Sequence, residues 1–223
     1  MAPNSQASPL SRRPYVDWAR GLAVLIMIEA HTLDAWTRPA DRSTYWFQRL
    51  TMLGGFAAPL FLWLAGLSLV LAAGRTYGRS GSRATATNAV VRRGTEIFIL
   101  AFLFRLQAFV VSPGSWPITI FRVDILNIMG PAIACAGLVW GASRGSKSAA
   151  TSCAVLAIGI AMLTPMVRTA HWVDVFPLWV QWHIRPFGDH TTFTFFPWSG
   201  FVFAGAAVGS LLHGTPNGPV GTT

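Results

Sequence analysis

The sequence predicts an all-α, polytopic membrane helical bundle of about six transmembrane helices with a cytoplasmic N-terminus. Of the 223 residues, 52% are hydrophobic and only 11% are charged, whereas about a quarter of an average soluble domain is charged. The apolar residues also form continuous blocks, close to the ~20 residues that a helix needs to cross a bilayer. Barrel strands would instead alternate over ~10 residues. These observations exclude an ordinary soluble fold.

Six apolar blocks of this kind follow one another along the chain. Each is long enough to cross the hydrocarbon layer as a helix with a rise of ~1.5 Å per residue. Their approximate limits are residues 18–36, 50–73, 91–112, 120–142, 148–167 and 195–212. We expect residues 1–12 to form a disordered cytoplasmic tail, residues 13–213 a transmembrane domain and residues 214–223 a flexible tail.

The connections between the blocks differ in length and composition. Residues 74–88 are rich in Gly, Ser, Thr and Arg, and residues 143–147 form a short polar hairpin. Residues 168–192 form the longest connection, which is aromatic and rich in histidine. Its composition is compatible with a position at the membrane interface, where aromatic side chains gather.

The distribution of Lys and Arg predicts the orientation. Ten of these residues fall on the side of the N-terminus and six on the opposite side, while Arg105 lies inside the third block. Because basic loops are retained in the cytoplasm, the N-terminus is expected there. The ten are Arg12, Arg13, Arg20, Arg75, Arg79, Arg83, Arg92, Arg93, Arg144 and Lys147, and the six are Arg38, Arg42, Arg49, Arg122, Arg168 and Arg185.

The net charge of +9 does not indicate a nucleic-acid partner. No run of Lys and Arg is interleaved with the polar or aromatic side chains that contact bases. The two cysteines, Cys135 and Cys153, lie in apolar blocks and are expected to be small buried hydrophobic residues. A disulfide-stapled scaffold is excluded as well.

The first apolar block carries the densest set of ionisable residues. At ~100° per residue, Asp17, Arg20, His31 and Asp34 lie near one stripe of the helix, and Glu29 points to the opposite side. Ionisable groups inside spans are costly and usually face a protein interior or a watery cavity. We therefore expect this stripe to face such an interior.

His31 and Asp34 are separated by three residues, which brings a carboxylate within reach of an imidazole ring. Such a pair would fix the tautomer of His31 and make it a candidate general base. The same spacing also fits two structural residues that satisfy each other near the membrane surface.

Arg105 lies ~20 Å from the basic end of the third block, by its position in a helix. An arginine at that depth needs a partner, and Glu29, at a similar depth, is the best carboxylate by this measure. A structural bridge between helices and a role in binding an anionic substrate are both open interpretations.

Polar residues also gather towards the outer side of the fourth block. Asp124 and Asn127 lie three residues apart and would line an outer cavity, or cap their own helix. His171, His183 and His190 belong to the long outer connection, and we include His190 among the cavity candidates. Their spacing matches no zinc signature, so we predict no metal site.

The start of the first block resembles a known family. The run from Arg13 to Arg20, RPYVDWAR, followed by Gly21, an apolar run and His31, is similar to the pattern R-x₃-D-x-x-R-G-x-A that opens the heparan-α-glucosaminide N-acetyltransferase catalytic domain. Bacterial members of that family were long known as a domain of unknown function. The segments APLFLWLAG at 58–66, RRG at 92–94 and FPWSG at 196–200 also resemble the family, so the resemblance covers residues 13–212.

The resemblance implies an integral-membrane acyltransferase. Such an enzyme moves an acetyl or other acyl group from cytoplasmic acyl-CoA, here acetyl-CoA, to an amine or hydroxyl of a sugar-like acceptor across the membrane. We expect the catalytic residues to be His31 as the base, Asp34 as its orienting group and Arg105 as a stabiliser of the oxyanion. Arg20, Arg92 and Arg93 would bind CoA phosphates. The substrate-cavity candidates are Asp17, Glu29, Asp124, Asn127 and His190.

Several alternatives remain at this stage. In lysosomal members of the family, a histidine on the luminal side after the first helix is the proposed acyl carrier. Residues 38–50 contain no histidine to match it, and a covalent acyl-histidine and direct transfer with His31 as the base are both compatible with the sequence. An acyltransferase-3-type enzyme, a proton or solute transporter that uses the polar stripe, and a scaffold protein are the competing classes. We expect a multi-pass protein of the bacterial inner membrane, with the bilayer, acyl-CoA and a carbohydrate-like acceptor as partners; a homo-oligomer is compatible with the sequence.

Overall fold

The computed structural model describes residues 14–112, 114 and 116–214. The predicted tail at residues 1–12 lies outside the described residues, as do residues 215–223 of the second tail. The chain divides into two compact units, Met1–Ala57 and Ala58–Thr223, which are described separately. The secondary structure of both is helical, which confirms the all-α class.

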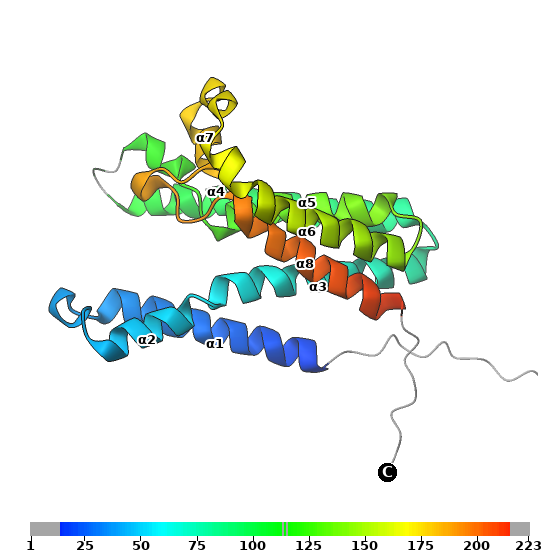
Figure 1. The fold of residues 1–223 in the computed structure, drawn as a ribbon, viewed down its shortest axis with the longest axis horizontal. Helices are drawn as coiled ribbons and strands as arrows, with labels where there is room; N and C mark the ends of the chain where they lie inside the picture. The colour runs from blue at the N-terminus through cyan, green and yellow to red at the C-terminus, as the bar shows by residue number, and fades with distance from the viewer. Residues whose placement is uncertain (1–13, 113, 115, 215–223) are drawn as a thin grey trace, which may run out of the picture. The chain divides into compact units, whose positions relative to one another are not determined.

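The first unit is a helical hairpin. It contains α1 (Pro14–Trp36), the short 3₁₀ helix η1 (Pro39–Asp41) and α2 (Tyr45–Gly54), as Figure 1 shows. Proline is favoured in the first turn, where its missing N–H is not needed. Thr44 caps α2 by accepting a hydrogen bond from the amide of Phe47 at 3.4 Å. A Cβ atom at Gly54 would lie 2.7 Å from that of Ala30, so the two helices pack closely there.

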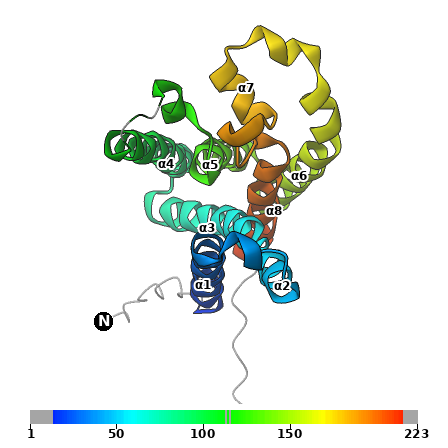
Figure 2. The ribbon, with the colours of Figure 1, turned by 90° about the vertical axis from the view of Figure 1, so that its left-hand side faces the viewer.

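The second unit is built from long helices that alternate in direction. They are α3 (Ala57–Ser80), α4 (Arg83–Val111), α5 (Ile125–Ala142), α6 (Ser146–Thr169) and α8 (Phe195–Gly214). The α3–α4 and α5–α6 turns lie at one end of this unit (Figure 1), and Figure 2 views the long helices end-on. The opposite end holds the short elements η2 (Pro117–Phe121), η3 (His171–Val175), α7 (Leu178–Ile184) and η4 (Gly188–His190).

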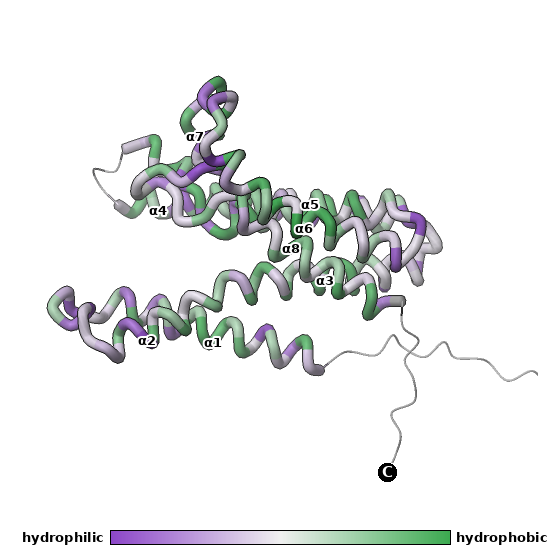
Figure 3. Tube along the Cα trace, in the orientation of Figure 1, coloured by the Kyte–Doolittle hydropathy of each residue, from purple (hydrophilic) through white to green (hydrophobic). Residues whose placement is uncertain are grey.

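Five stretches of the described helices are long and apolar enough to cross a membrane. They contain α2 with α3, and then α4, α5, α6 and α8, which agrees with the second to sixth predicted spans. Along the long helices apolar residues predominate (Figure 3), and many are exposed, as lipid contact requires. Helix α1 has 23 residues but carries too many charges to be among the five stretches, so its position in a bilayer stays a prediction.

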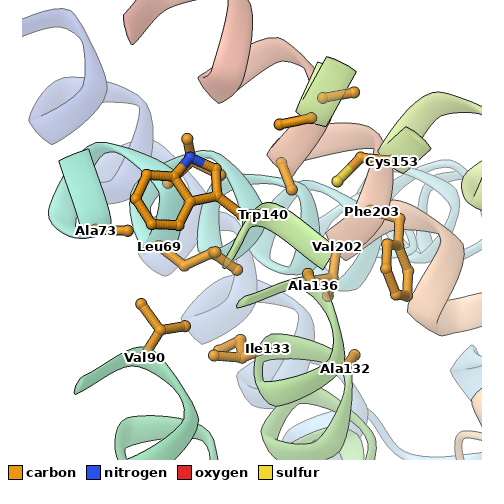
Figure 4. Close-up of a cluster of buried hydrophobic side chains, with 14 of the residues drawn as sticks. Leu69, Ala73, Val90, Ala132, Ile133, Ala136, Trp140, Cys153, Val202 and Phe203 are labelled. Carbon is orange, nitrogen blue, oxygen red and sulfur yellow. The ribbon is translucent and has the colours of Figure 1, made fainter. Parts of the chain in front are cut away.

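The core of the second unit lies between α3, α4, α5, α6 and α8. Leu69, Val90, Ile133 and Trp140 meet there, with small alanines between them (Figure 4). Cys153 belongs to this core, as expected, but Cys135 is exposed on α5. The sequence prediction that both thiols are buried is therefore wrong for Cys135, because an apolar helix in lipid can expose a residue on any face.

Glycines bring the long helices into backbone contact. A Cβ atom at Gly66 of α3 would collide with the carbonyl of Val202 on α8, and one at Gly205 would collide with the carbonyl of Trp63. Both glycines therefore lie where α3 and α8 pack against each other. Helices α4 and α5 meet in the same way, since a Cβ at Gly94 would lie 2.6 Å from the carbonyl oxygen of Gly130. Small residues at such crossings let membrane helices approach closely.

Gly205→Leu is expected to lower the free energy of unfolding of the second unit by about 3 kcal/mol or more. This is the upper end of the range that overpacking typically costs. The atoms it would meet belong to the backbone of α3, which cannot move aside as a side chain would. Thermal unfolding in detergent measures the effect. Gly159→Ala on α6 is the control, since nothing lies within 4 Å of its Cβ position. Equal melting temperatures for Gly205→Leu and the wild type would contradict the α3–α8 contact.

Candidate functional site

The polar stripe of α1 begins with an ion pair. The Nη1 atom of Arg20 lies 3.5 Å from the Oδ1 atom of Asp17, one helical turn earlier. Both side chains are partly exposed in this unit, and pairs of this kind contribute at most about 1 kcal/mol. The two charges of this stretch of the stripe therefore lie next to each other.

His31 is held by the backbone of its own helix. Its Nδ1 atom lies 2.8 Å from the carbonyl oxygen of Met27, so Nδ1 donates a proton there and Nε2 carries the free lone pair. Side chains in a helix lean back towards its N-terminus, which directs this ring to the preceding turn and away from Asp34. The expected orientation of His31 by the Asp34 carboxylate is therefore wrong.

Asp34 instead binds an arginine from the connection after α1. The Nη1 atom of Arg42 lies 3.3 Å from its Oδ1 atom, and Nη2 of Arg42 donates to the Asp34 carbonyl at 2.7 Å. The same guanidinium reaches the carbonyl of Thr37 at 3.4 Å. Arg42 thus satisfies carbonyls that the end of α1 leaves unpaired, where positive charge is favourable. The Asp34 carboxylate thus holds Arg42, the side chain that caps the C-terminal end of α1.

Arg105 pairs with Asp124 inside the second unit. The Nη2 atom of Arg105 donates to the Oδ2 atom of Asp124, and the side chains are only 21% and 35% exposed. The sequence pointed to Glu29 because its estimated depth matched, but depth does not determine which helices are neighbours. Helices α4 and α5 pack along their lengths, and Asp124 directly precedes α5. The expected pairing with Glu29 is corrected to Asp124.

Asp124 and Asn127 form the N-terminal cap of α5. The amide of Asp124 donates to Oδ1 of Asn127 at 3.0 Å, which is half of a capping box. Asn127 is buried, and its Nδ2 atom finds no partner among the described residues. Of the two sequence interpretations, the local cap is the one that the structure forms. The cap also keeps the Asp124 carboxylate beside Arg105.

The segment that carries His190 is attached to the same place. The amide of Val123 donates to the carbonyl of His190 at 3.0 Å, and the amide of Thr192 donates to the carbonyl of Val123 at 3.2 Å. The His190 ring lies 4.6 Å, centroid to centroid, from the indole of Trp182. Trp182 in turn packs with Val123 in a small core. Arg105, Asp124, Asn127 and His190 therefore gather at one end of the second unit.

His183 of α7 is the group that sequence reasoning left unassigned. Its Nδ1 atom lies 2.9 Å from the carbonyl of Trp179, while its buried Nε2 atom has no partner among the described residues. The ring lies 6.3 Å from that of Phe98, which shares a face of α4 with Arg105 seven residues later. Burial lowers the pKa of His183, and the bond to the Trp179 carbonyl partly opposes this shift.

The lowered pKa of His183 predicts a loss of stability in acid. A histidine whose folded pKa is depressed stabilises the fold above its ordinary value of ~6.5 and loses that contribution as the pH falls through the folded value. Melting temperatures between pH 8 and pH 5 should therefore fall more steeply for the wild type than for His183→Phe. His171→Phe, at an exposed histidine, is the control and should follow the wild type. Parallel curves for wild type and His183→Phe would contradict this assignment.

Two further arginines stabilise the same end. Nη2 of Arg168 donates to the Thr194 hydroxyl at 2.9 Å and to the carbonyl of Phe196 at 2.8 Å, which joins the end of α6 to the start of α8. Arg185 pairs with Asp174 beside α7. Arg168 and Arg185 are thus occupied by partners within their own unit.

Arg92 and Arg93 lie nearer the opposite end of α4 and share one carboxylate. Glu96 lies 3.5 Å from Nε of Arg92 and 3.4 Å from Nη1 of Arg93. The two arginine side chains are 81% and 71% exposed, so both remain accessible to an anionic ligand. They precede Arg105 by about 20 Å along the helix. No group of three or more His, Cys, Asp or Glu residues that could hold a metal occurs among the described residues.

Fold and polar groups together define an integral membrane protein with a polar cluster at one end of its helical bundle. The chain belongs to the family described as heparan-alpha-glucosaminide N-acetyltransferase, catalytic, which matches residues 12–219. This family membership makes the protein a membrane transferase. No curated protein and no solved structure matches the chain.

Proposed function

We propose that this protein transfers an acetyl group from acetyl-CoA in the cytoplasm to an amine or hydroxyl of a sugar-like acceptor on the far side of the membrane. The observation that carries the proposal is the family match over residues 12–219, which covers nearly all the described helices. The membrane-length helices support it, because donor and acceptor on opposite sides require a protein that spans the bilayer.

The proposed step is a direct acyl transfer. The acceptor nitrogen or oxygen attacks the thioester carbonyl carbon, the carbon–sulfur bond breaks, and coenzyme A leaves as a thiolate. The acceptor proton passes to a base, and the Nε2 lone pair of His31 is suited to accept it. The carbonyl of Met27 fixes this tautomer, which replaces the role first expected of Asp34. His31 ends the opening segment whose sequence resembles the start of the family's domain, which supports the choice of this histidine.

Arg105 is the proposed stabiliser of the negative charge that develops on the thioester oxygen. A guanidinium in a partly buried, low-dielectric setting stabilises such charge more than one in water. The Asp124 carboxylate holds this guanidinium through one of its terminal nitrogens. Asp124 is thus a positioning residue for Arg105, and Asn127 positions Asp124 through the cap of α5.

The donor is proposed to approach from the end of the second unit where the α3–α4 and α5–α6 turns lie. Basic residues concentrate on this side in the sequence, which favours a cytoplasmic location. Exposed Arg92 and Arg93 would meet the phosphates of CoA, with Arg20 of α1 in the same role. We place the protein in the bacterial inner membrane as part of this proposal.

The test uses the full chain purified in detergent and then reconstituted in liposomes. Radiolabelled acetyl-CoA is supplied, and transfer of label to glucosamine and other amino sugars is measured. In detergent, acetyl-CoA at 100 times its dissociation constant should stabilise the protein by ~2.7 kcal/mol, and ATP should not. Proton or solute flux without consumption of acetyl-CoA would instead identify a transporter and overturn the proposal.

A further inference from the structure

Two grooves run along the surface of the second unit, one on either side of α6. The groove between α5 and α6 has a volume of about 720 Å³, and the groove between α6 and α8 about 650 Å³. Both begin at the α5–α6 turn, and Thr151 lines both of them. Their walls belong to membrane-length helices, so hydrocarbon chains surround them in a bilayer.

The groove between α5 and α6 is polar at one end only. Arg144, Ser148 and Ser152 line the part nearest the turn, and Val155 and Leu156 line the part further along α6. The change from polar to apolar takes place within ~12 Å along the helix, from residue 148 to residue 156. An occupant that fits this lining has an anionic head and an apolar tail.

Three hydroxyl groups in this groove are not used by their own helix. Elsewhere the hydroxyls of Thr87 and Thr164 donate to the carbonyl four residues earlier, at 2.9 and 2.7 Å. The side-chain hydroxyls of Ser148, Thr151 and Ser152 form no hydrogen bond with any residue that the structure describes. Their donors therefore remain available to an external acceptor, and an unsatisfied hydroxyl beside lipid is costly.

The second groove repeats the same plan with a different cation. Lys147 lies at its head, and the rest of its wall is built mainly from alanines of α6 and α8, such as Ala154 and Ala207. Neither Lys147 nor Arg144 forms an ion pair with a residue in the described part of the chain. Two free cations thus stand side by side at one turn, each at the head of an apolar groove.

We propose that the α5–α6 turn binds the phosphate headgroup of an anionic phospholipid, whose acyl chains lie in the two grooves. Arg144 and Lys147 neutralise the phosphate, and the hydroxyls of Ser148, Thr151 and Ser152 donate hydrogen bonds to its oxygens. Basic pockets between membrane helices are typical sites for such headgroups. The alanine-lined groove favours an acyl chain over the polar adenosine of a soluble nucleotide. The proposal rests on the membrane bundle and does not depend on the acyl transfer proposed above.

The test measures binding of phosphatidylglycerol to the full chain in a neutral detergent, by native mass spectrometry and by the shift in melting temperature. Phosphatidylglycerol should raise the melting temperature, and phosphatidylcholine should not. The double variant Arg144→Ala/Lys147→Ala should weaken phosphatidylglycerol binding at least about tenfold. Arg75→Ala/Arg79→Ala is the matched control, because it removes two exposed charges from the end of α3 and should bind as the wild type does.

A single substitution separates hydrogen bonding from surface charge. Thr151→Val removes the shared hydroxyl at constant size and charge, and should weaken phosphatidylglycerol binding severalfold while leaving the lipid-free melting temperature unchanged. Equal losses in the test and control double variants would show a general charge effect and overturn the site. Stabilisation by inorganic phosphate or by coenzyme A that equals that of phosphatidylglycerol, and that Arg144→Ala/Lys147→Ala abolishes, would assign the pocket to a soluble phosphate and overturn the lipid.

Discussion

His31→Ala should lower kcat for acetyl transfer by about 10²–10⁴-fold, the range that a positioned general base contributes. The imidazole is exposed within its unit, and among the described residues its one hydrogen bond is to the carbonyl of Met27, so its loss should hardly change folding. The measurement is steady-state transfer from labelled acetyl-CoA, with the melting temperature recorded in parallel. Added imidazole should restore part of the lost rate in His31→Ala, because it supplies the missing base.

Asp34→Asn and His171→Ala are the controls for this prediction. Because Asp34 binds Arg42 and leaves His31 to the backbone, Asp34→Asn should change kcat only severalfold. His171 is an exposed histidine of η3, and its replacement should leave the rate unchanged. A loss in Asp34→Asn as large as that in His31→Ala would restore the carboxylate–imidazole pair that the sequence suggested. Full activity in His31→Ala would remove His31 from the mechanism.

The spans were predictable from the sequence because hydropathy acts locally. A block of apolar residues must cross the bilayer whichever neighbours it has, so α4, α5, α6 and α8 formed where the composition indicated. The fourth span begins at Ile125, a few residues later than predicted, because Asp124 and Asn127 cap the helix there. An aspartate followed three positions later by an asparagine is a recognisable sequence signal for the start of a helix. The same two residues could also have lined a cavity, so the sequence left both interpretations open.

The pairings of the site were less predictable, for two physical reasons. Spacing along a helix places His31 and Asp34 on one face, but side-chain direction decides which group each one reaches. Many polar groups lie at the same depth along their spans as Arg105. The packing of α4 against α5 determines that its ion-pair partner is Asp124. His183 was missed because α7 is a short helix inside a long connection. A helix of this length is too short for the spacing of its hydrophobic residues to show which face is buried. Its only sequence signal is its place in the aromatic run LWVQWHI.

Arg105→Met should cost more stability than the ~1 kcal/mol of an exposed pair and less than the ~3–5 kcal/mol lost when a fully buried pair is broken. The pair is partly shielded, at 21% and 35% exposure, and the substitution leaves the Asp124 carboxylate without its cation. Asp124→Asn should cost a similar amount, since asparagine still caps α5 and only the charge is lost. Unfolding in detergent at constant pH measures both.

The double variant Arg105→Met/Asp124→Asn decides between structure and chemistry. Removing both charges leaves no unpaired ion, so the double variant should be more stable than either single variant. The double-mutant cycle should give a coupling free energy between Arg105 and Asp124 well above that of the exposed pair Arg93–Glu96. If Arg105 stabilises the thioester oxygen, this stable double variant should still lose about 10²–10³-fold in kcat. Full activity in a folded double variant would make the pair structural alone, because a catalytic guanidinium cannot be replaced by a thioether.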